Sequence, residues 1–167
     1  MRHLAAALLM FFALPCMAKT ASQEPNDNCG ARTLSGGTVF TLTVERSFQP
    51  GLAFLLCQRK APNQSFLLIQ SELKSASTNK KIMLNDKDFV ELMGLYENAL
   101  TYNARDHIIG LDGSIWCLET KRGLNYSKAC FYTPGYDTGA RGLTGLNLLG
   151  VALWKIGSMS TAAGKLY

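Results

Sequence analysis

Apolar and polar residues alternate after residue 37, and this pattern predicts β-strands. In residues 38–46, Phe40, Leu42 and Val44 share one side, which is typical of a strand buried on one face. The residues on the other side are Val39, Thr41, Thr43 and Glu45. Residues 52–59 form a nearly continuous apolar stretch, which predicts a second and more deeply buried strand. The pattern therefore predicts two neighbouring strands joined by a short turn.

Turn-forming residues divide the following region into a meander. Pro50 and Gly51 are a strong turn pair and predict the first reversal of the chain. The polar segment 61–64 predicts a second turn before a third strand at 65–74. Residues 80–84 then predict a short edge strand, whose lysines would protect it from pairing with other chains.

Two helices are predicted from apolar residues that repeat every three or four positions. The first is expected at about 86–98, with Asn85 or Asp86 as its N-cap. The second is expected at about 140–156 and should close over the sheet. Glycines lower helix propensity, so this helix needs close packing to compensate; they are Gly139, Gly142, Gly145 and Gly150.

A β-hairpin is predicted between the two helices. Its strands are expected at 114–120 and 124–132, joined by a four-residue loop at 122–125. Together these elements predict an α+β fold in which an antiparallel sheet of five or six strands is packed by two helices. The expected domain covers residues 38–167.

The chain length and composition limit the classes of protein that are possible. The chain has 167 residues, of which 47% are hydrophobic and 17% are charged, so we expect one folded domain rather than a disordered or multidomain protein. The net charge is +5, which favours acidic partners without identifying one. The basic residues occur as scattered pairs, so no nucleic-acid surface is predicted.

The first 18 residues have the pattern of a signal peptide. A basic start precedes the apolar run Leu4–Leu14, which is too short to span a bilayer and is followed by small residues that predict cleavage after Ala18. Cys16 raises the alternative of a lipoprotein, but Pro15 stands where a lipid-attachment motif takes a small residue. We therefore expect soluble export to the bacterial periplasm, without a transmembrane segment.

Four cysteines remain after cleavage, and an even number in an exported domain predicts two disulfides with three possible connectivities. Cys117 and Cys130 would lie opposite each other in the predicted hairpin. Cys29 would then pair with Cys57 and pin the N-terminal arm, residues 19–37, to the second strand. Spacing leaves the other connectivities open. With a single histidine in the mature chain and no Cys-x-x-Cys pair, no metal site or cofactor is expected.

One segment resembles a known group of sequences. Residues 111–119 read Leu-Asp-Gly-Ser-Ile-Trp-Cys-Leu-Glu, and a Gly-x-x-Tyr segment follows at 123–126. This pattern resembles one in uncharacterised exported bacterial proteins; the motif residues are Asp112, Gly113, Trp116 and Glu119. The chain differs from that group by placing two cysteines in the hairpin, which suggests a disulfide-stabilised version. The resemblance implies no activity.

Two groups of residues have both a catalytic and a structural interpretation. Asp112 and Glu119 could act as paired carboxylates of an envelope hydrolase, but Asp-Gly is an ordinary turn pair. His107 beside Asp106 could act as a base with its orienting group, but no serine or cysteine nucleophile has a recognisable context. We therefore assign no catalytic residue and expect the protein not to be an enzyme.

Binding is the remaining function class. Loops usually carry recognition residues, and the candidates for a contact surface are Tyr102, Arg105, His107, Tyr136 and Arg141. A small exported domain without a credible active site is expected to be a periplasmic immunity or inhibitor protein that occludes a cognate toxin or lytic hydrolase of the cell envelope. The alternatives are an envelope-acting hydrolase and a noncatalytic cell-wall binding module. The oligomeric state stays open.

Overall fold

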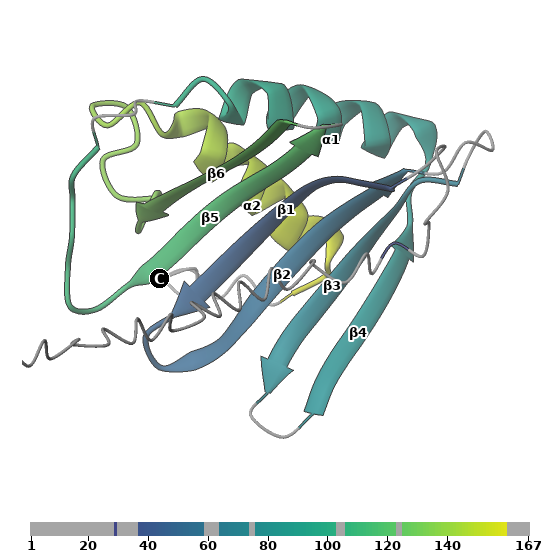
Figure 1. Cartoon of the computed structure of the whole chain (residues 1–167), viewed down its shortest axis with the longest axis horizontal. Helices are drawn as coiled ribbons and strands as arrows, with labels where there is room; N and C mark the ends of the chain where they lie inside the picture. Colours follow the sequence, from purple (N-terminus) through teal and green to yellow (C-terminus); the bar gives the residue numbers. More distant parts are fainter. Residues whose placement is uncertain are drawn as a thin grey trace, which may run out of the picture.

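The computed structural model of the chain describes residues 29, 37–58, 64–73, 76–102, 106–122 and 125–159. These ranges form six strands and two helices, and Figure 1 shows both helices on one face of the sheet. The strands are β1 (Gly37–Arg46), β2 (Gln49–Gln58), β3 (Phe66–Leu73), β4 (Ala76–Met83), β5 (Ser114–Arg122) and β6 (Asn125–Tyr132). The helices are α1 (Asp86–Ala99) and α2 (Thr144–Ile156). The predicted α+β fold is confirmed.

The sheet is antiparallel throughout, in the order β4-β3-β2-β1-β5-β6. Strand β1 pairs with both β2 and β5, because the chain crosses the helix side of the sheet between β4 and β5. Arg46 at the end of β1 is therefore paired with Ser114 at the start of β5. This crossover brings the loop before β5 next to the turn between β1 and β2.

The main core lies between the sheet and the helices. Phe40, Leu42 and Val44 of β1 are buried on this side, as their alternation predicted, and the ring of Tyr96 in α1 stacks on Phe40 with 4.9 Å between ring centroids. Helix α1 begins at its N-cap Asn85, whose side chain accepts a hydrogen bond from the backbone N–H of residue 88 at 2.8 Å. Both helices thus cover one continuous apolar layer.

Two glycines in α2 make that layer tight. A methyl group at Gly150 would collide with the indole of Trp116 in β5, and one at Gly145 would come within 2.5 Å of the backbone oxygen of Asn98 in α1. The predicted close helix-to-sheet packing is confirmed at Gly150, whereas Gly145 packs against α1 and Gly139 and Gly142 precede the helix. Packing compensates for the helix propensity that the two glycines in α2 lack.

The face of the sheet opposite the helices carries both disulfides. A second cluster of buried residues gathers there around Cys57, including Leu55, Phe66 and Leu68. Cys29 is bonded to Cys57, and Cys117 in β5 is bonded to Cys130 in β6. The predicted connectivity is therefore confirmed.

Three predicted boundaries are wrong. Pro50 and Gly51 lie within β2, because Arg46 pairs with Gln49 and closes the turn earlier. Strand β4 begins at residue 76 rather than 80, because backbone pairing with β3 needs no apolar side chains. Helix α2 begins at residue 144, because the preceding residues form turns in which Gly142 has a φ of +67°.

The hairpin of β5 and β6 is also tighter than predicted. Arg122 pairs with Asn125, so the strands reach the residues that had been assigned to the loop. In the part of the chain that is described, neither helix has the length and apolar character that crossing a bilayer requires. The predicted signal peptide and all of the N-terminal arm except Cys29 and Gly37 lie outside the described residues.

Candidate binding site

A cavity of about 590 Å³ lies where the loop before β5 passes the ends of β1, β5 and β6. We call residues 106–113 the rim loop. The cavity is lined by residues 45–47, 106–111, 113–115 and 130–132. It therefore combines the rim loop and the β5–β6 hairpin with the end of β1, which lies far from them in the sequence.

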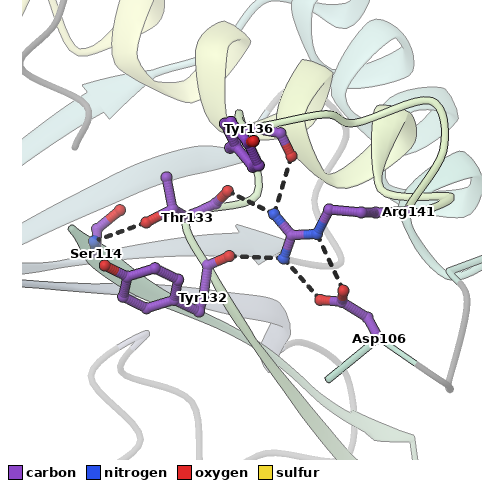
Figure 2. A network of polar contacts seen from close by, with 6 residues as sticks. All are labelled: Asp106, Ser114, Tyr132, Thr133, Tyr136 and Arg141. Atoms are coloured by element: carbon purple, nitrogen blue, oxygen red, sulfur yellow. Dashed lines mark hydrogen bonds and ion pairs between the residues drawn. The ribbon is translucent and has the colours of Figure 1, made fainter. Parts of the chain in front are cut away.

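Arg141 anchors the start of the rim loop. Its Nε donates to Oδ1 of Asp106 at 3.0 Å and its Nη2 to Oδ2 at 2.7 Å, which makes a bidentate ion pair (Figure 2). The same guanidinium donates to the backbone oxygens of Tyr132 at 2.7 Å and of Thr133 and Tyr136 at 2.9 Å. Its side chain is 5% exposed and that of Asp106 is 4% exposed. One cation thus ties the rim loop to the end of β6.

The ion pair changes the acidity of Asp106. Hydrogen bonds from Arg141 lower the pKa of the Asp106 carboxyl below its usual value, and they outweigh the opposing effect of burial. Asp106 therefore holds its negative charge, as the buried cation requires.

A second set of hydrogen bonds holds the other end of the rim loop. The hydroxyl of Ser47, in the β1–β2 turn, donates to the backbone oxygen of Gly113 at 3.0 Å and accepts from its N–H at 3.1 Å. Gly113 has a φ of +148°, a conformation that side chains disfavour. A side chain at Gly110 or Gly113 would also collide with Tyr132. Both glycines let the loop lie directly against β6.

Apolar side chains project outward from this well-anchored region. Leu111 and Ile109 of the rim loop are 98% and 90% exposed, and Phe48 in the adjoining turn is 86% exposed. Ile115 at the start of β5 is also exposed and lines the cavity. We call these four residues the apolar rim. Large exposed apolar side chains on an anchored scaffold are typical of surfaces that bind proteins.

The predicted contact residues differ in their exposure to solvent. His107 is exposed and lines the cavity, and Tyr136 is exposed in the turn after β6. Tyr102 is half-buried, with its ring edge-on to Phe131 at 5.0 Å between ring centroids. Arg105 lies outside the described residues.

Arg141 does not belong to an exposed contact surface, contrary to expectation. The sequence places it in a glycine-rich loop, but the fold buries its guanidinium among three carbonyl oxygens and a carboxylate. The same ion pair occupies both carboxylate oxygens of Asp106. Asp106 is therefore committed to Arg141 rather than to orienting His107.

The motif residues at 112–119 do not gather into an active site. Trp116 is buried, and its indole N–H donates to the hydroxyl of Ser114 at 2.8 Å. Asp112 is exposed in the rim loop, whereas Glu119 is half-buried near the middle of β5. Glu119 lies five positions after Ser114 along β5, which places their Cα atoms roughly 17 Å apart at ~3.3 Å per residue, so Glu119 is far from the rim loop that carries Asp112. Paired carboxylates of glycosidases lie within ~10 Å of each other.

The apolar rim was missed by the sequence analysis. No sequence pattern singled out Ile109, Leu111 or Phe48 as contact residues. Bulky apolar residues beside glycines in a predicted loop were the available signal. Whether such residues fold inward depends on tertiary contacts, so the sequence left their exposure open.

Within the described ranges, no three His, Cys, Asp or Glu side chains lie close enough together to hold a metal ion. The site is thus defined by exposed apolar side chains on an anchored loop and by the cavity behind them. Comparisons with protein-family models, with curated proteins and with solved structures found no match to this chain.

Proposed function

We propose that this protein is an exported immunity or inhibitor protein, which acts in the periplasm by occluding a toxin or lytic enzyme of the cell envelope. The observation that carries this proposal is the apolar rim, whose side chains are exposed although the loop beneath them is anchored at both ends. Exposed apolar side chains on an anchored loop suit contact with the cleft of another protein. The inserted side chains would sterically exclude the substrate from that cleft.

The energetics favour a protein partner. Burial of a leucine, isoleucine or phenylalanine side chain is worth about 1.5–3 kcal/mol, so Phe48, Ile109 and Leu111 together could stabilise a complex by several kcal/mol. An anchored loop loses little conformational entropy on binding, which preserves more of that gain. These residues therefore serve as the predicted anchors of the interface.

The compartment is supported by the disulfides and by the signal-peptide pattern. Disulfides persist in oxidising compartments, and this domain has two that fasten strands and arm on one face of the sheet. An inhibitor of envelope enzymes would act in the periplasm, where such bonds are stable.

The test is inhibition of purified enzymes by the purified, oxidised protein. A panel of muramidases, peptidoglycan amidases, peptidoglycan peptidases and phospholipases is titrated with the wild-type protein, and residual activity and complex stoichiometry are measured. We expect one class to be inhibited at a fixed ratio. Ile109→Asp and Leu111→Asp should raise the inhibition constant by about a hundredfold or more, because each would bury a charge at the interface.

A matched control is Val90→Asp, which changes an exposed apolar residue on α1, away from the apolar rim. It should inhibit like the wild type. A complex that forms without loss of enzyme activity would refute inhibition, and equal inhibition by the Ile109 and wild-type proteins would refute the role of the apolar rim.

A further inference from the structure

Strand β6 forms one edge of the sheet and pairs on its inner side with β5. Residues 125–128 and Cys130 are exposed, so side chains of this strand are accessible along most of its length. Among the described residues, no strand lies along its outer side. An edge of this kind offers backbone groups to an added strand.

The hydrogen-bond register shows which backbone groups face outward. The N–H of Thr133 donates to the oxygen of Ser114 at 2.6 Å, which sets the alternation along the β5–β6 ladder. Cys117 and Cys130, with 4.0 Å between their Cα atoms, fit the close pairs that share no backbone hydrogen bonds. It follows that the N–H and C=O groups of residues 126, 128, 130 and 132 point away from β5.

One of these outward groups already has a partner. The oxygen of Tyr132 accepts from Arg141, as an outward direction requires. The Asp106–Arg141 ion pair and the rim loop therefore close the end of the edge. The remaining outward groups belong to Tyr126, Lys128 and Cys130.

The opposite edge of the sheet is protected differently. Strand β4 has two adjacent lysines. The Nζ of Lys80 donates to the backbone oxygen of Gly157 at 2.7 Å, and the Nζ of Lys81 lies 4.2 Å from the ring centroid of Phe66. These contacts fasten long charged side chains along β4. Strand β6 has a single charged residue, Lys128, and is therefore the less protected edge.

The edge of β6 also leads directly into the cavity. Cys130, Phe131 and Tyr132 line it, together with Ile108 of the rim loop and Ile115 of β5. A segment that pairs with β6 would therefore bring one of its side chains to an apolar hollow. Backbone pairing combined with a side-chain pocket is a common mode of peptide recognition.

We propose that β6 receives an extended segment of the partner protein as a seventh strand, with an apolar side chain in the cavity and an acidic residue opposite Lys128. The acidic residue is inferred from Lys128, the only charged side chain of the edge strand, and from exposed Lys121 on β5. Glu119, which pairs with Lys128 on β5, is half-buried and accepts a hydrogen bond from the hydroxyl of Tyr126. This inference rests on the proposed function, since it describes how the inhibited partner is held.

The test uses a phage-displayed library of random 12-residue peptides, selected on the oxidised full-length protein. Selected sequences should alternate in character, with one large apolar residue and at least one acidic residue. A synthetic peptide of the consensus sequence is then titrated against Lys128→Pro and Lys128→Thr. Proline removes an outward N–H that β5 does not use, so the fold should tolerate it, whereas threonine keeps the donor.

We expect Lys128→Pro to weaken peptide binding by about tenfold or more and Lys128→Thr by about threefold or less. Hydrogen exchange of the backbone amides tests the same inference in the wild-type protein, without a substitution. On binding, the amides of Tyr126, Lys128 and Cys130 should become protected, while those of Ser127 and Ala129, already bonded to β5, should change little.

The inference is overturned if no peptide is enriched, if Lys128→Pro binds as tightly as the wild type, or if the new protection lies away from β6. A wild-type dimer that Lys128→Pro dissociates would make the added strand a second copy of this chain, which also overturns it. Enzyme inhibition that Ile109→Asp abolishes and Lys128→Pro leaves intact would refute the added strand alone. Peptide binding to β6 without inhibition of any enzyme would refute the proposed function alone.

Discussion

Leucine and isoleucine side chains occupy opposite environments in two regions of this molecule. On the inner side of α2, Leu149 has no exposed surface and packs in the main core. On the rim loop, Leu111 and Ile109 are almost fully exposed. The core is stabilised by close packing of side chains, as the contact of Gly150 with Trp116 illustrates. The rim loop is held by polar bonds to its backbone and to Asp106, which leaves its apolar side chains free to bind.

The two regions should therefore fail in different ways. A change of side-chain volume should destabilise the core, because interiors are packed as densely as crystals. The rim loop should tolerate changes to its exposed side chains but depend on its polar anchors. The following predictions test this distinction, in order of decreasing effect on the free energy of unfolding.

Asp106→Ala should have the largest effect. It leaves the guanidinium of Arg141 buried without its carboxylate, which costs about 3–5 kcal/mol. Urea unfolding measures the loss. The double variant Asp106→Ala/Arg141→Met should recover part of it, because the unpaired charge is gone. A single variant as stable as the wild type would show that the ion pair is not what anchors the loop.

Leu149→Ala and Leu111→Ala compare the same substitution in the two regions. In the core it should lower the free energy of unfolding by about 2–5 kcal/mol, because it leaves a cavity. On the rim loop the change should stay within about 0.5 kcal/mol. Thermal and urea unfolding provide both values. Similar losses at the two positions would contradict the assignment of Leu111 to the exposed rim.

Gly150→Ala should destabilise the protein by about 1–3 kcal/mol although alanine is the better helix former, because its methyl group would collide with Trp116. The matched control is Gly94→Ala in α1, where nothing lies within 4 Å of the added methyl group. The control should stabilise the protein by about 0.5–1 kcal/mol. Stabilisation by both variants would mean that α2 lies farther from the sheet.

The pH dependence should be the smallest effect. The pKa of Asp106 in the folded protein lies below its ordinary value of 3.8, so its stabilising contribution is complete above that value and is lost as the pH falls through the lower, folded value. Unfolding experiments between about pH 2 and 6 should show a steeper loss for the wild type than for Asp106→Asn. Equal slopes would indicate that Asp106 is not paired.

Much of the fold was predictable because it depends on local patterns. Alternation in β1, the repeat of apolar residues in α1 and the even number of cysteines each follow from the chain's own spacing. The turn at Pro50 was predicted wrongly because strand pairing, which is not local, pairs Arg46 with Gln49 and closes the turn before Pro50. The start of β4 shifted for the same reason.

The binding site was predictable only in part. His107 was identified correctly as an exposed loop residue, but Arg141 was placed on the surface because its neighbours are glycines and turn residues. Its actual partner, Asp106, lies 35 residues earlier in the chain. Burial of an arginine depends on such distant acceptors, and no local pattern reports them.

The sequence by itself determined the fold class, the order of the helices and strands and the number of disulfides, because these follow from short-range periodicity and from the count of cysteines. It favoured the observed cysteine pairing but left the other pairings open. Only the tertiary structure decided that Arg141 turns inward, that Ile109 and Leu111 stay outside, and that β6 forms an edge. These features depend on the crossover from β4 to β5, which brings the rim loop beside β1 and β6. The solvent exposure of a side chain depends on contacts between segments that are distant in the sequence, so local sequence patterns do not predict it.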